Sequence, residues 1–158
     1  MANYLFLLAF TVLLCSSCNS DDGTPENCGC DAETQYTLPN EEFEEIYGIT
    51  PEKQTTGLLY YKHTEIVDGY ADHVEEFRNK FWIFQGTEGC GNCRRVFIVC
   101  NDDLVGEEFT YLKKEGVYDS IAVKFFGDVK SDSECVEPFI ALADMYYATI
   151  KLNRIELK

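Results

Sequence analysis

Five segments of the chain have the composition of β-strands, and their order limits the folds available to it. Each is rich in aromatic and β-branched residues, which favour extended structure and pack well on a pleated surface. The segments span residues 58–66, 81–86, 95–100, 120–130 and 148–157. The last two alternate apolar with polar residues, as strands with one buried face do, whereas the third is apolar almost throughout. The sequence therefore predicts a mainly β protein.

Two short helical segments are predicted beside these strands. Asn40 precedes a run in which Phe43, Ile46 and Tyr47 follow helical spacing, with glutamates in the first turn, where the helix dipole favours acidic residues. Residues 102–116 carry apolar side chains that fit a short helical segment closing one end of a barrel. Five strands with a helical segment between the third and fourth have the order of an OB-type barrel. We expect this barrel to occupy residues 40–158 as a single domain.

Residues 56–158 resemble the small OB-like domains of envelope lipoproteins in Gram-negative bacteria. The resemblance is carried, in order, by residues 56–59 (TGLL), 100–104 (CNDDL), 121–129 (IAVKFFGDV) and 146–157. It implies a five-stranded barrel and a location in the cell envelope. Because that group has no uniform biochemical activity, the resemblance implies no particular function.

An uncharged apolar run at residues 4–14 has the length of a signal-peptide core and is too short to span a bilayer as a helix. Ser16, Ser17 and Cys18 follow it and resemble the end of a bacterial lipobox, in which the cysteine is acylated and becomes the first residue. The sequence thus predicts a lipoprotein signal peptide at residues 1–17 and lipidation of Cys18. The alternative is an ordinary secretory signal cut near Ser17, which would leave Cys18 for a disulfide.

Residues 18–39 are polar, acidic and without periodicity, so we expect a flexible tether there. The sequence Ser20-Asp21-Asp22 resembles the acidic tether of surface-exposed lipoproteins, which favours the outer membrane and its outward side as the location. Acyl chains on Cys18 make the membrane the first expected partner, because two or three chains anchor a protein stably.

The balance of charge argues against one class of partner. Acidic residues outnumber basic residues 28 to 13, which gives a formal net charge of −15. Affinity for nucleic acid comes largely from Lys and Arg side chains that neutralise phosphates. We therefore expect no nucleic-acid partner.

The chain has 8 cysteines, a number that favours an oxidising compartment. Six remain once the signal peptide and the acylated cysteine are set aside, and this even number predicts disulfides. We expect Cys100, at the end of the third strand, to pair with Cys135. The other two bridges are expected to join the tether to the turn after the second strand, pairing Cys28 and Cys30 with Cys90 and Cys93.

The C-x-x-C motif formed by Cys90 and Cys93 leaves two alternatives open. Such a motif can run thiol–disulfide exchange, and Arg94 and Arg95 would favour a thiolate. Four sulfurs from this motif and the C-x-C at residues 28–30 could instead hold zinc. We favour disulfides, because a redox C-x-x-C usually begins a helix and a C-x-C half is uncommon in zinc sites. No metal or other cofactor is expected.

Aromatic side chains give the remaining indication of function. OB barrels use exposed aromatic residues to stack bases or sugars, and Trp82 and Phe126 lie on strands expected to form the outer binding face. Core packing is the competing interpretation. His63 and His73 stand among carboxylates, but their spacing favours a solvated loop over a metal site.

The sequence contains no phosphate-binding loop, nucleophile elbow or zinc-protease motif. We therefore expect a monomeric, non-enzymatic binding or interaction module that is anchored in the envelope and whose ligand is an unidentified protein or glycan. The alternative is a thiol-redox or metal-handling envelope protein that uses Cys90 and Cys93.

Overall fold

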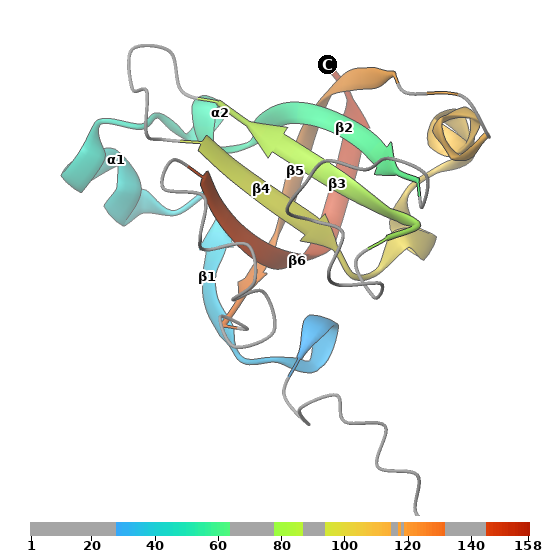
Figure 1. Cartoon of the computed structure of the whole chain (residues 1–158). Coiled ribbons are helices and arrows are strands. Elements are labelled where there is room, and N and C mark those ends of the chain that lie inside the picture. Colours follow the sequence, from blue (N-terminus) through green and yellow to red (C-terminus); the bar gives the residue numbers. More distant parts are fainter. Residues whose placement is uncertain (1–27, 64–77, 87–93, 115–116, 118, 132–144) are drawn as a thin grey trace, which may run out of the picture.

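The computed structural model describes residues 28–63, 78–86, 94–114, 117, 119–131 and 145–158. The predicted signal peptide, Cys18, Cys90, Cys93, Cys135 and His73 lie outside these residues. Six strands form one sheet: β1 (Thr34–Leu38), β2 (Thr56–Lys62), β3 (Lys80–Gln85), β4 (Arg94–Val99), β5 (Ser120–Lys130) and β6 (Met145–Leu157) (Figure 1).

The sheet closes into a barrel because β6, at one end of the strand order, also pairs with β5. The strand order is β1-β5-β2-β3-β4-β6, and β6 also pairs with β5. The β4–β6 pair is parallel and the others are antiparallel. Without β1, the closed cycle β5-β2-β3-β4-β6 has the strand order of a five-stranded OB-type barrel. The predicted mainly β, OB-like fold is confirmed.

Strand β6 makes the closure by changing partners along its length. Its first half, to Ile150, pairs with β4, and its second half pairs with β5. A register shift between Phe126 and Gly127 bends the β5–β6 pair. A Cβ atom on Gly127 would lie 2.5 Å from the carbonyl oxygen of Lys151, so the close approach of the two strands requires glycine here.

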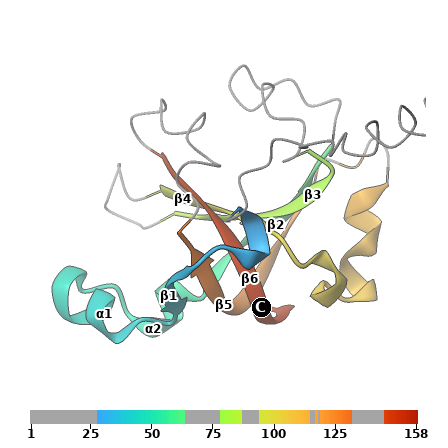
Figure 2. The same ribbon diagram turned by 90° about the horizontal axis from the view of Figure 1, so that it is seen from below.

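The predicted helical segments are also present. Helix α1 (Glu41–Tyr47) begins at Asn40, whose side chain accepts a hydrogen bond from the amide of Glu42, and ends at Gly48 with φ 65°. Helix α2 (Pro51–Gln54) follows directly. Between β4 and β5 lie two 3₁₀ segments, η4 (Asp102–Leu104) and η5 (Glu107–Lys113). Figure 2 shows α1 and α2 on one side of the barrel and the 3₁₀ segments on the opposite side.

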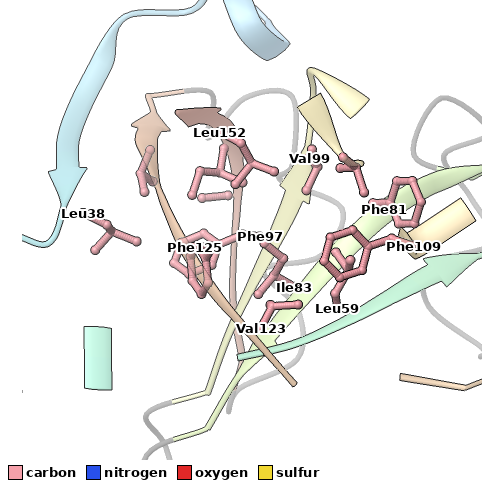
Figure 3. Close-up of a cluster of buried hydrophobic side chains, with 14 of the residues drawn as sticks. Leu38, Leu59, Phe81, Ile83, Phe97, Val99, Phe109, Val123, Phe125 and Leu152 are labelled. Atoms are coloured by element: carbon pink, nitrogen blue, oxygen red, sulfur yellow. The ribbon is translucent and has the colours of Figure 1, made fainter. Parts of the chain in front are cut away.

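The core fills the interior of the barrel (Figure 3). Phe97 and Phe125 meet near its middle with ring centroids 5.8 Å apart. Phe109 and Leu112 of η5 are fully buried and belong to the same cluster, so the 3₁₀ segment plugs one end. Asn101 fixes the strand exchange nearby, because its side chain accepts from the amide of Leu152 and donates to the carbonyl of the same residue.

The expected tether is wrong for residues 29–38, which fold against the barrel and add a sixth strand to its sheet. A 3₁₀ turn, η1 (Gly29–Asp31), precedes β1, and β1 pairs antiparallel with the second half of β5. Leu38 is 1% exposed and is part of the core. Only Tyr36 and Leu38 are apolar in β1, which is too short an alternation to stand out in a polar stretch. Among the described residues, no helix is long and apolar enough to cross a membrane.

Candidate functional site

A disulfide joins Cys30 to Cys100, with their Cα atoms 5.4 Å apart. The predicted pairing of Cys100 with Cys135 is therefore wrong, as is the pairing of Cys30 with the C-x-x-C motif. The physical reason is the folding of the supposed tether, since η1 lies against β6, which pairs with β4 just before Cys100. Closing a loop with a sequence separation of 70 residues stabilises the fold by about 4 kcal/mol in the chain-entropy model. Cys28 is also disulfide-bonded.

Trp82 does not stand on an exposed binding face. It is 3% exposed and points away from the barrel core, where its ring packs near Tyr60 and Tyr147 at centroid distances of 6.1 and 6.3 Å. The ammonium of Lys62, also 3% exposed, lies 5.6 Å from the Trp82 ring centroid. The hypothesis of solvent-exposed stacking on Trp82 is wrong, and the competing interpretation of packing holds.

The burial of Trp82 closes the surface that OB barrels commonly use. That surface lies on their second and third strands, which correspond here to β3 and β4. Val96 and Ile98 on the outer side of β4 are buried beside Trp82. Of the described residues at the centre of this face, Trp82, Val96 and Ile98 are therefore all too buried to offer a stacking surface.

Phe126 differs, because it lies at an open surface of β5. It is half-buried and has two cations over its ring, with the guanidinium carbon of Arg154 at 4.6 Å and the Lys124 ammonium at 5.5 Å from the centroid. It shares none of these neighbours with Trp82, so the two aromatic residues singled out in the sequence do not form one site.

A pocket of about 310 Å³ opens beside Phe126, and a second pocket of about 320 Å³ adjoins it and shares Thr56 and Lys158. We call the first the Phe126 groove. Its lining is mixed: one aromatic ring, two prolines, two threonines, two lysines and one glutamate. These residues are Pro39, Pro51, Glu52, Thr55, Thr56, Lys124, Phe126 and Lys158.

The charges around the Phe126 groove nearly cancel. Arg154 is paired with Glu156 at 3.1 Å, and Glu156 faces Lys124 across the β5–β6 pair. Glu52 adds a further carboxylate to the wall. A groove with a ring, hydroxyls and balanced charges suits a polar ligand with an apolar face better than it suits a polyanion.

Buried amides make one wall of the groove rigid. Gln54 is fully buried; its amide nitrogen donates to the carbonyls of Asn40 and Ile49, and its amide oxygen accepts from the Asn40 backbone. Gln85 of β3 donates to the carbonyls of Lys53, Gln54 and Thr56 at 2.7–3.1 Å. These bonds fix α2 on the barrel. Neither glutamine stands out in the sequence, because a polar residue at the end of an element carries no pattern that predicts burial.

His63 is a structural residue and not part of a solvated loop. Its Nε2 lies 3.0 Å from the carbonyl oxygens of both Leu112 and Val117. Two acceptors require Nε2 to carry the proton, so His63 ties the end of β2 to the 3₁₀ plug. Within the part of the chain that the structure describes, no group of three potential ligands could hold a metal ion.

Comparison with known proteins adds no relative, since no protein-family model, curated sequence or solved structure matches the chain.

Proposed function

We propose that this protein is a lipid-anchored lipoprotein of the bacterial cell envelope, in the outer membrane, that acts as a monomeric, non-enzymatic binding module. The observation that carries the proposal is the Cys30–Cys100 disulfide, because such bridges persist in oxidising compartments outside the cytoplasm. The lipobox-like Ser16-Ser17-Cys18 supports the anchor.

The disulfide has a consequence for the position of the barrel. Cys30 is fixed to the barrel and lies only 12 positions after Cys18. A chain of that length spans at most about 40 Å when fully extended and about 20 Å as a flexible coil. The barrel is therefore held close to the membrane. Because a net charge of −15 repels anionic headgroups, the acyl chains supply the attachment.

The Phe126 groove supports the binding role. It is open, one wall is fixed by the Gln54 and Gln85 bonds, and its mixed lining offers stacking and hydrogen bonding together. An unidentified glycan or protein side chain with an apolar face fits this chemistry.

The anchor is tested by expressing the full chain in a Gram-negative host and comparing Cys18→Ala with the control Cys15→Ala. We expect the wild type and Cys15→Ala in the membrane fraction, with a mass that includes acyl chains beginning at Cys18. Cys18→Ala should lack the acyl mass. A wild-type mass without acyl chains, or cleavage that leaves Cys18 unacylated, would favour the ordinary secretory signal and refute the proposed lipid anchor.

The thiol-redox or metal-handling alternative is tested on the same material by alkylation before and after reduction, with a scan for bound metal. Six cysteines that resist alkylation until reduced support the binding module. Two reactive thiols at Cys90 and Cys93, or bound zinc, would instead assign the activity to the C-x-x-C motif.

A further inference from the structure

The inward-facing side chains are apolar at one end of the barrel and polar at the other. The end at η5 is plugged by Phe109 and Leu112. At the other end the inward positions become polar: Gln85 ends β3 and faces Arg95 near the start of β4, and Arg95 faces Tyr146 near the start of β6. Strand alternation puts Arg95 on the same side of β4 as the core residue Phe97. The mouth of a barrel is a common place for a ligand site.

Arg95 is a cation without a counter-charge among the described residues. It is half-buried, its Nη1 is fully buried, and that nitrogen has no hydrogen-bond partner. Its guanidinium carbon lies 4.9 Å from the ring centroid of Phe43 in α1, which covers one face of the group. Burying a guanidinium nitrogen without a hydrogen-bond acceptor costs free energy, and native proteins rarely contain such an unpaired nitrogen.

Aromatic residues from β1, α1 and β6 surround this cation, on the side of the barrel where Figure 1 shows α1, β1 and the first residues of β4 and β6. The Tyr36 ring lies 4.8 Å from that of Phe43, and Tyr36 is hydrogen-bonded with Tyr146. The Tyr146 hydroxyl donates to the side-chain oxygen of Gln35 at 3.1 Å. We call Tyr36, Phe43, Arg95 and Tyr146 the Arg95 cluster.

Tyr36 does not supply the missing negative charge. Burial raises the pKa of its phenol well above the usual value, and neighbouring Tyr146 raises it further, against the opposing effect of Arg95. Tyr36 therefore stays protonated at neutral pH and offers a hydroxyl, not an anion.

The cluster is open at its rim. Tyr146 is 44% exposed, and Tyr47, whose ring lies 5.9 Å from that of Phe43, is 64% exposed. The neighbouring Ile46 is 66% exposed. Exposed aromatic rings next to a guanidinium that has no carboxylate partner among the described residues form a surface with an apolar and a cationic part.

We propose that the Arg95 cluster binds a pyranose sugar that carries a single carboxylate. A guanidinium pairs with a carboxylate through two parallel hydrogen bonds, which would give Arg95 the counter-charge that no described residue supplies. The apolar face of a sugar ring packs on an aromatic ring such as Tyr146 or Tyr47, and the Gln35 amide and tyrosine hydroxyls bind sugar hydroxyls. A net charge of −15 repels polyanions, so the ligand carries one acid group and not many. This site is distinct from the Phe126 groove and does not depend on the anchor.

The test uses two probes that differ only in the acid group, methyl glucuronide and methyl glucoside, titrated into the mature protein in detergent and followed by NMR. Arg95→Gln removes the cation, and Arg94→Gln is the matched control, because Arg94 is exposed and points to the opposite face of β4. We expect wild type and Arg94→Gln to bind the glucuronide at least ten-fold more tightly than the glucoside. Arg95→Gln should lose that preference, and Tyr146→Ala should weaken both probes alike.

Three results would overturn the proposal: equal binding of the two probes by wild type, no binding of either, or equal effects of Arg94→Gln and Arg95→Gln. If Arg95→Gln does not fold, Arg95→Lys replaces it, since a lysine keeps the charge but cannot pair bidentately and should lose part of the preference. If the wild type binds neither sugar and Arg95→Gln lowers Tm more than Arg94→Gln does, the Arg95 guanidinium stabilises the fold and does not bind a ligand.

Discussion

Two lysine–aromatic pairs on the outer surface of the barrel have nearly the same geometry and opposite environments. The Lys62 ammonium lies 5.6 Å from the Trp82 ring centroid, and that of Lys124 lies 5.5 Å from the Phe126 centroid. Lys62 and Trp82 are buried, whereas Lys124 and Phe126 are half-exposed beside an open groove. The same contact thus belongs to the fold on one side of the barrel and to a surface that a ligand can reach on the other.

Burial changes what such a contact contributes. A cation over an aromatic ring stabilises by about 0.5–1 kcal/mol at an exposed site and by about 2 kcal/mol or more when water is excluded. The buried ring also loses its whole packing environment when it is truncated. The comparison therefore predicts that equivalent substitutions have unequal effects on the two sides.

The largest expected difference is between Trp82→Ala and Phe126→Ala. Removing the buried indole should lower the free energy of unfolding by about 3–5 kcal/mol, and removing the half-exposed ring by about 1 kcal/mol. Urea unfolding followed by far-UV circular dichroism measures both, because Trp82 is the only tryptophan and its fluorescence is lost in the first variant. Equal losses for the two variants would contradict the distinction between a closed and an open side.

A smaller difference is expected for the lysines. Lys62→Ala should lower the free energy of unfolding by about 2 kcal/mol, since both the buried stem and the contact with Trp82 are lost. Lys124→Ala should lower the free energy of unfolding by about 0.5 kcal/mol, as expected for an exposed contact. Lys62→Met is the control, because it keeps the packing of the stem and removes the charge. If Lys124→Ala proved as costly as Lys62→Ala in the same urea titration, the groove side would be as much part of the fold as the Trp82 side.

The sequence predicted the strands well because their signal is local. Alternation and β-branched residues marked five of the six strands within a few residues, and Asn40 and Gly48 marked the ends of α1. β1 was missed because its only apolar residues are Tyr36 and Leu38, and its strand conformation depends on pairing with β5, far away in the sequence.

Burial on the outer face could not be predicted in the same way. The segment around Trp82 is apolar on both sides, so alternation does not say which side meets solvent. The burial of Trp82 follows from Tyr60 on β2 and Tyr147 on β6, which come together only through the pairing of strands far apart in the sequence. The same holds for the Arg95 cluster, whose members come from four elements. The partner of Cys100 likewise depended on where η1 lies.

The last comparison concerns fluorescence and not stability, and it moves the tryptophan from one side of the barrel to the other. Trp82 in the wild type should emit at short wavelength and be quenched weakly by acrylamide, because it is 3% exposed. In the double variant Trp82→Phe/Phe126→Trp, the indole stands at the Phe126 groove and should emit at longer wavelength and be quenched strongly. Both proteins unfolded in guanidinium should give the same spectrum, which controls for sequence context. Strong quenching of the wild type, or weak quenching of the variant, would contradict the distinction between a buried Trp82 and an open Phe126 groove. If it holds, wild-type fluorescence is a poor reporter of ligands, and the tryptophan at position 126 is the one to follow when glycans are added.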